Sequence, residues 1–222
     1  MRPLGARVVA RVRANGTRLV LPPHASGMTI GLFGGSFDPP HEAHRQVALV
    51  ALHRLGLDAV WWLVTPGNPL KVGRSLAPLA DRIAAAQRLA RHPRIHVTGI
   101  EAALGTRFTF DTIAALQARA RGVRFVWIMG ADNLVQFHRW QNWQGIAERL
   151  PLAIVDRPGA SLKAAASVVA QRLARYRLDE TDGTLLGAMA APAWVFLHGL
   201  KSPLSSTAIR SRNYSIELSG SA

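Results

Sequence analysis

Short apolar runs alternate along the chain with longer segments in which apolar residues recur every three or four positions. Apolar runs bounded by turn residues are typical of buried strands, and the longer spacing is typical of amphipathic helices. The runs predict strands at 29–33, 59–64, 94–98, 125–129, 152–155 and 194–197. The longer spacing predicts helices at 41–55, 79–91, 111–121, 133–149, 162–174 and a short one from Ser206. Acidic and then small residues at 178–192 predict a surface loop.

The strand and helix candidates follow one another in the order that builds parallel sheets. Parallel strands need crossover connections, which are usually helical and right-handed. The predicted fold class is therefore α/β: a doubly wound, mostly parallel sheet of the Rossmann-like type, with helices on both faces. Ligands bind such sheets beyond the carboxyl ends of the strands, so a site is expected in the segments that follow strands.

Composition limits the possible classes of protein. The 222 residues carry a formal net charge of +14 and no cysteine. Without cysteine there are no disulfides and no thiolate metal sites, and a cytoplasmic location is expected. No apolar run reaches the roughly 18 residues that a membrane-spanning helix requires. The positive charge suits a polyanion such as a nucleotide, a nucleic acid or an anionic membrane, although a coding bias toward arginine explains it equally well.

The first 27 residues differ in character from the rest of the chain. Arginines lie there among proline, glycine and asparagine, with no acidic residue. Met28 directly precedes the first predicted strand. We therefore expect residues 1–27 to be a flexible basic extension, or the result of a misassigned start codon, and residues 28–222 to form the domain.

The most informative segment joins the first predicted strand to the first predicted helix. Gly34 and Gly35 end the strand, where a missing side chain lets a ligand approach the backbone. His41 and His44 follow three residues apart, so their side chains point the same way on a helix. With Asp38 as the predicted N-cap, free N–H groups and the helix dipole favour an anion there. The segment predicts a phosphate site; the alternatives are a tight turn with incidental histidines, or a zinc site that needs a third ligand.

Hydroxyl and basic side chains gather in a second segment, further along the chain. Ser205, Ser206 and Thr207 suit a helix N-cap and can donate hydrogen bonds to phosphate. Arg210 lies one turn further on, and a planar guanidinium can bind two phosphate oxygens at once. By itself this segment is typical of a capped surface helix. Beside the first segment it predicts the other half of a polyphosphate site.

Two further segments lie at predicted helix starts. Asp132 closes a strand and can accept hydrogen bonds from ribose hydroxyls, or it can simply cap the next helix. Trp140 follows on that helix and offers a face for a flat aromatic ring, whereas Trp143 is a candidate for the core. The helix start at Thr109 leaves backbone N–H groups free to hold a carboxylate.

Taken in order, these motifs resemble those of a known family. The segments 31–44, 109–112, 130–132 with Trp140, 157–159 and 205–210 are similar to those of bacterial nicotinate-mononucleotide adenylyltransferases. This family belongs to the HxGH nucleotidyltransferase superfamily of Rossmann-like folds. The resemblance implies transfer of AMP from ATP to nicotinate mononucleotide, which gives nicotinate adenine dinucleotide and pyrophosphate in NAD biosynthesis. One departure is Ala43, where the superfamily usually has glycine.

The resemblance also implies a role for each motif. His41, His44 and Arg210 would be catalytic and would stabilise charge on the phosphates in the transition state. The implied ATP-binding residues are Gly34, Gly35, Ser36, Phe37, Gly130, Asp132, Arg157, Ser205, Ser206 and Thr207. The implied residues for the mononucleotide are Lys71, Thr109 and Trp140. Magnesium would arrive with ATP, held by phosphates and water, and no metal site of the protein's own is expected.

Other functions stay open at this point. The same chemistry could act on another phosphorylated acceptor, such as nicotinamide mononucleotide or phosphopantetheine. A basic nucleic-acid-binding protein would need clustered arginines and aromatic platforms, and the arginines here are scattered, so no nucleic acid is expected as a partner. No nucleophile–base pair stands out, which favours catalysis by positioning without a covalent intermediate. The sequence indicates no oligomeric state.

Overall fold

The computed structural model describes residues 11–14, 17–67, 75–157 and 161–199. Within this part of the chain, the main sheet has seven strands in the order β5-β4-β3-β6-β7-β9-β8, and all neighbours are parallel. These strands are β3 (Thr29–Gly35), β4 (Ala59–Val64), β5 (Ile95–Thr98), β6 (Arg124–Gly130), β7 (Leu152–Val155), β8 (Arg177–Leu178) and β9 (Trp194–Leu197). The prediction of a doubly wound α/β fold is confirmed.

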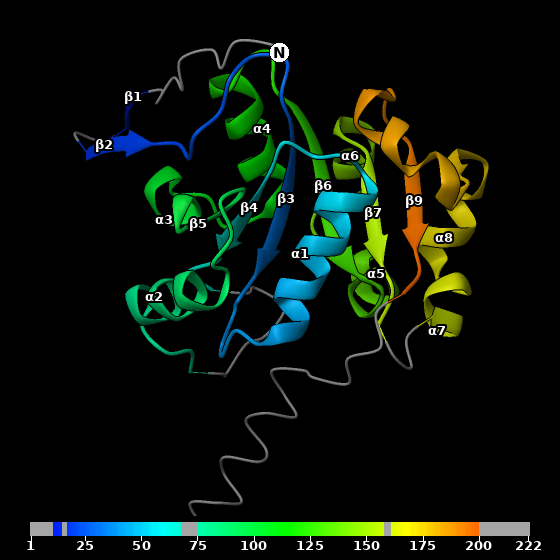
Figure 1. The fold of residues 1–222 in the computed structure, drawn as a ribbon, viewed down its shortest axis with the longest axis horizontal. Helices are drawn as coiled ribbons and strands as arrows, with labels where there is room; N and C mark the ends of the chain where they lie inside the picture. Colours follow the sequence, from blue (N-terminus) through cyan, green and yellow to red (C-terminus); the bar gives the residue numbers. More distant parts are fainter. Residues whose placement is uncertain (1–10, 15–16, 68–74, 158–160, 200–222) are drawn as a thin grey trace, which may run out of the picture.

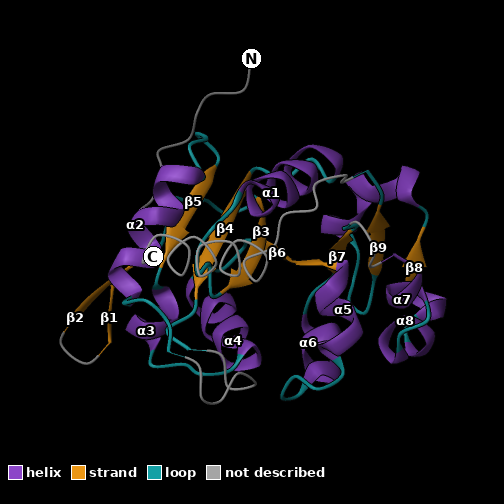
Figure 2. Ribbon diagram, turned by 90° about the horizontal axis from the view of Figure 1, so that it is seen from below, coloured by secondary structure: helices purple, strands orange, loops and turns teal. Residues whose placement is uncertain are grey.

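Helices cover both faces of the sheet (Figure 1). They are α1 (Glu42–Arg54), α2 (Leu79–Leu89), α3 (Ile100–Leu104), α4 (Thr109–Arg119), α5 (Ala131–Phe137), α6 (Trp143–Arg149), α7 (Ser161–Ala165) and α8 (Val168–Arg172), with the 3-10 helices η1 (Ala174–Tyr176) and η2 (Glu180–Ala188). Figure 2 shows α1 on one side of the sheet and α4, α5 and α6 on the other. None of the helices in the described residues is long and apolar enough to cross a membrane.

The two faces of the sheet make two apolar cores. Helices α1 and α2, with η2, pack on one core, and α3 to α8 pack on the other. Successive strand residues alternate between them, so Trp61 lies in one core and Trp62 in the other, both fully buried. This double burial explains why every residue of β4 is buried, and why its sequence is a continuous apolar run.

Two predicted helices are wrong in their extent. The helix predicted at 133–149 is divided into α5 and α6, because Asn142 adopts the left-handed region at φ 51°. Its side chain instead caps α6 by accepting a hydrogen bond from the N–H of Gly145. The helix predicted at 162–174 is likewise divided, and Ser167 caps α8. Short polar side chains compete with helix continuation in this way.

Other differences concern short elements. The surface loop predicted at 178–192 is wrong, since this segment contains η2 and its Leu186 is fully buried. Strand β8 and helix α3 were not predicted, because elements of two and five residues are too short to show a period.

Part of the segment assigned to the basic extension packs on the domain. The strands β1 (Arg11–Ala14) and β2 (Thr17–Val20) pair antiparallel in a small separate sheet. Leu21 is 1% exposed within the core, and the ring of His24 meets Trp61 edge-on with centroids 5.8 Å apart. A domain boundary at residue 28 stays a prediction.

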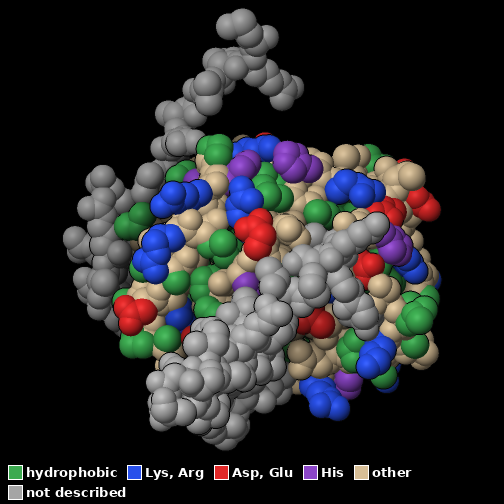
Figure 3. Space-filling model, turned by 60° about the horizontal axis from the view of Figure 1, so that its bottom comes forward, with side chains coloured by type: hydrophobic (Ala, Val, Ile, Leu, Met, Phe, Trp, Pro, Cys, Tyr) green, Lys and Arg blue, Asp and Glu red, His purple; other side chains and the backbone are tan. Residues whose placement is uncertain are grey.

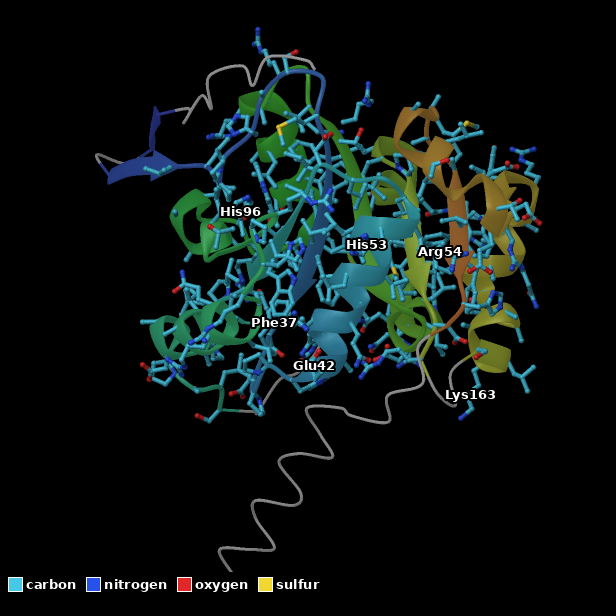
Figure 4. The ribbon with its side chains drawn as sticks, viewed as in Figure 1. Phe37, Glu42, His53, Arg54, His96 and Lys163 are labelled. Atoms are coloured by element: carbon cyan, nitrogen blue, oxygen red, sulfur yellow. The ribbon has the colours of Figure 1, made fainter. Side chains whose placement is uncertain are left out.

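The strand order reverses beside β3. From β3 the chain builds β4 and β5 on one side, and then β6, β7 and β9 on the other. At such a reversal the connections leave neighbouring strands in opposite directions, which opens a crevice beyond their carboxyl ends. The strands run downward in Figure 1, and Figure 4 places Phe37 and Glu42 near this lower edge.

Candidate active site

The end of β3 lies close against its neighbour β6. A Cβ atom on Gly34 would lie 2.7 Å from Cη2 of Trp127, a residue that is 1% exposed. No side chain fits in that space, so glycine is required for packing at this position. The sequence predicted that a ligand approaches the backbone at Gly34. The structure shows that the space on the Cβ side of Gly34 is filled by the Trp127 ring.

Phe37 follows in a backbone conformation that residues other than glycine rarely adopt, with φ 46°. Its buried ring stacks on Trp62 of β4, with centroids 4.8 Å apart and planes 7° apart. The same ring meets that of His44 edge-on at 4.9 Å. These contacts hold the strained residue in place and tie the glycine loop to α1. Strain of this kind is concentrated at functional sites.

His41 and His44 lie together at the start of α1, as their spacing predicted. Their rings stack with centroids 3.7 Å apart. The backbone N–H of His41 donates to Nδ1 of His44 at 3.2 Å, so the neutral His44 ring carries its proton on Nε2. Burial, and then the charges of His41 and Arg157, lower the pKa of His44 well below its ordinary value. His44 is therefore a neutral hydrogen-bond donor at physiological pH.

The N-cap prediction for α1 is wrong. Asp38 was expected there, but His41 takes the position with extended backbone, and Glu42 is the first helical residue. Residues that precede a proline avoid helical conformations, so the helix does not start at Asp38 or Pro39 and begins only after Pro40. The two histidines thus occupy the N-cap and the third helical position, where the N–H of one can reach the ring of the other.

The ends of β6 and β7 add a charged pair. Nη1 of Arg157 donates to Oδ2 of Asp132 at 3.2 Å. Both side chains pass close to Gly130. A Cβ atom on this residue would lie 2.5 Å from Asp132 Oδ1 and 2.9 Å from Arg157 Cδ, so a larger residue would displace the pair. Since the charge of Arg157 also acts on His44, residues from the ends of three strands come together. Their roles toward a ligand stay predictions.

Trp140 is half-buried on the turn after α5. Its ring meets Phe137 edge-on at 5.2 Å and Trp127 at 6.1 Å, which connects it to the core beneath the glycine loop. Trp143 belongs to the core, as expected, but it begins α6 and does not share a helix with Trp140.

Thr109 is the first residue of α4, so the helix start expected there is confirmed, while its role toward a carboxylate stays a prediction. Other predicted site residues lie outside the described part of the chain: Lys71, Ser205, Ser206, Thr207 and Arg210. Their positions relative to the histidine pair stay predictions as well.

Two buried charged residues near the site were not singled out from the sequence. Arg82 of α2 is 3% exposed and donates to backbone carbonyls of the loops after β3 and β4. Glu101 of α3 is 7% exposed; burial raises its pKa to about 7, and a hydrogen bond with the Thr65 side chain opposes the rise. The sequence held one signal for Arg82, because it shares the inner face of its helix with Leu79 and Ala86.

The described residues offer little to a metal ion. Among them, no group of three or more His, Cys, Asp and Glu side chains is placed to hold one. Nδ1 of His44 is already engaged with the backbone of His41. The arrangement of a glycine loop, a histidine pair and an Asp–Arg pair beyond a parallel sheet defines a nucleotide-binding α/β protein.

Comparison with known proteins agrees with this class. A sequence model of the Cytidylyltransferase-like family matches residues 32–212. Proteins named "Probable nicotinate-nucleotide adenylyltransferase" are 57% identical over 189 residues in Mesorhizobium japonicum and 60% identical over 183 residues in Bradyrhizobium sp. strain BTAi1. The alignments cover 85% and 82% of this chain, and 97% and 95% of those proteins. The chain therefore belongs to the cytidylyltransferase-like family and, within it, to the nicotinate-nucleotide adenylyltransferases.

Solved structures give the same fold. Plasmodium falciparum nicotinic acid mononucleotide adenylyltransferase superimposes with a TM-score of 0.62 in its complex with APC and 0.64 in its complex with NaAD. Each match covers 83% of both chains at 15% identity. At this identity the likeness concerns the fold alone.

Proposed function

We propose that this protein transfers the AMP group of ATP to nicotinate mononucleotide, which yields nicotinate adenine dinucleotide and pyrophosphate in NAD biosynthesis. The observation that carries the proposal is the stacked His41–His44 pair at the start of α1, beyond the point where the strand order reverses. The choice of acceptor is supported by relatives at 57–60% identity that are named for this activity.

In the proposed reaction, a phosphate oxygen of the mononucleotide forms a bond to the α-phosphorus of ATP. The bond between the α-phosphorus and the bridging oxygen breaks, and pyrophosphate leaves with the electron pair. The protein contributes alignment and charge stabilisation, which are the main needs of phosphoryl-type transfer. His44 suits this task, because its Nε2–H can donate to the oxygens of the α-phosphate as charge develops on them.

The remaining roles are proposed from the resemblance and the positions described above. Asp132, with Arg157 beside it, would bind the ribose and line the adenosine pocket. Trp140 would stack on the pyridine ring, and the N–H groups at Thr109 would receive its carboxylate. The triphosphate would also be held by residues outside the described part of the chain, namely Ser205, Ser206, Thr207 and Arg210, and the acceptor phosphate by Lys71.

Magnesium enters the proposal as a complex with ATP. It prefers phosphate and water oxygens and keeps much of its hydration, so it needs few ligands from the protein. When bound, it would neutralise charge on the departing pyrophosphate.

A nucleic-acid-binding function has less support. Lys and Arg side chains are spread over the face in Figure 3, among hydrophobic and acidic ones, and they do not form a stripe there. A basic tract along one face would be expected for nucleic-acid binding.

The proposal is tested by pyrophosphate release with ATP and magnesium, using nicotinate mononucleotide, nicotinamide mononucleotide and phosphopantetheine as acceptors. Mass spectrometry identifies each dinucleotide product. We expect the highest kcat/KM with nicotinate mononucleotide. A preference for either other acceptor would overturn the assigned substrate, and no release with any acceptor would overturn the activity.

A further inference from the structure

Arg82 is a buried cation whose hydrogen bonds in the described part of the chain all go to backbone carbonyls, and the charge of Asp38 also acts on it. It lies on α2, is 3% exposed, and makes no ion pair with the acidic residues in the described part of the chain. A buried charge is costly unless hydrogen bonds replace the lost water. The hydrogen bonds of Arg82 therefore have to replace the hydration that burial removes.

The guanidinium binds carbonyl oxygens from three separate segments. Nε donates to the Ala77 carbonyl at 2.8 Å, just before α2. Nη1 donates both to the Ser36 carbonyl at 2.7 Å and to the Thr65 carbonyl at 2.8 Å, and Nη2 lies 3.4 Å from the Pro66 carbonyl. Arg82 therefore joins the glycine loop after β3 to the loop after β4, and anchors both to α2.

The bond to Ser36 also sets the direction of the next N–H group. The peptide between Ser36 and Phe37 is trans, so its C=O and N–H point in opposite directions. With the Ser36 carbonyl turned toward Arg82, the N–H of Phe37 faces away from it. Among the described residues that N–H donates to no acceptor. The bond to Arg82 thus fixes the peptide plane of a residue whose φ of 46° depends on support from its surroundings.

We propose that Arg82 is a positioning residue that fixes the triphosphate loop relative to the acceptor loop. The inference rests on the proposed function, in which the loop at 34–37 meets ATP and the loop after β4 leads to Lys71 and the mononucleotide. A single side chain then sets the alignment of the two reacting groups without touching either of them. Alignment acts on the transition state, and a displacement of about 1 Å can cost about a hundredfold in rate.

The test is Arg82→Lys, with Arg82→Gln as a second variant and Arg88→Lys as the matched control. Arg88 lies exposed on the same helix, so its substitution changes the same chemistry away from the loops. Lysine keeps the charge but lacks the planar fork that spans carbonyls from three segments. We expect Arg82→Lys to lower kcat at least about tenfold at a temperature where the protein is fully folded. Arg82→Gln should do the same, and Arg88→Lys should match the parent protein.

Hydrogen exchange provides a readout that does not depend on activity. In both Arg82 variants, exchange should increase in peptides covering 31–41 and 59–67, and it should stay unchanged in those covering 143–155. If the melting temperature falls while kcat of the folded variants stays normal, Arg82 is structural only and the proposal is overturned. Increased exchange in one loop alone would overturn the link between loops. If the parent protein transfers no AMP, the proposed function fails, and the exchange data still decide whether Arg82 joins the loops.

Discussion

Glu101→Gln should make the protein more stable at alkaline pH, by an amount that grows with pH. The Glu101 carboxyl is 7% exposed, and burial raises its pKa from 4.5 to about 7. Because the folded state holds this proton more tightly than the unfolded chain does, the stabilisation is fully present below about pH 4.5 and is lost as pH rises toward 7. At about 1.4 kcal/mol per pKa unit, the loss is about 3 kcal/mol.

Urea unfolding of both proteins, at pH values from about 4 to 8, measures this effect. Glutamine resembles the protonated carboxyl in shape, so the two free energies of unfolding should nearly agree at about pH 4. The variant should be more stable by about 3 kcal/mol at pH 8. Glu148→Gln, on the exposed surface of α6, is the control for removal of a solvated carboxyl. A difference between Glu101→Gln and the parent that is constant with pH, or that shrinks as pH rises, would refute the reasoning.

Three further substitutions address the site itself. His44→Ala removes the Nε2 donor and should lower kcat at least about a hundredfold with an unchanged circular dichroism spectrum; near-normal pyrophosphate release would contradict its role. Gly34→Ala forces a Cβ atom against Trp127 and should cost about 1–3 kcal/mol of unfolding free energy. Trp127→Phe in the same chain should recover part of that loss, and simple additivity would contradict the clash. Trp140→Ala should raise the KM for the mononucleotide by up to about tenfold. An effect on the KM for ATP alone would show that Trp140 does not contact the mononucleotide.

Parts of the fold could be predicted because the pattern that encodes them is local. Strands β4 and β7 have the predicted bounds, since strands buried on both faces are continuous apolar runs. The divisions at Asn142 and Ser167 were missed, because each depends on whether one short side chain bonds the backbone or extends the helix.

In the site, too, the sequence predicts where residues lie along an element but not which contacts they make. The spacing of His41 and His44 places them on one side of a helix start, but the stacking and the tautomer depend on a bond from a backbone N–H. Arg82 is the clearest example of a residue whose contacts the sequence does not reveal. Its partners, Ser36 and Thr65, are distant in the sequence, and carbonyl groups carry no residue type that a sequence pattern could reveal.

The most direct test of the account follows the phosphorus atoms of ATP. The parent protein and His44→Ala are incubated with nicotinate mononucleotide and ATP that is labelled at the α-phosphate or at the γ-phosphate. The account predicts that the parent protein transfers the α-label to the dinucleotide and the γ-label to pyrophosphate, with no label on the protein, and that His44→Ala does so far more slowly. Label bound to the protein, or γ-label in the nucleotide product, would contradict direct transfer of AMP at the histidine pair.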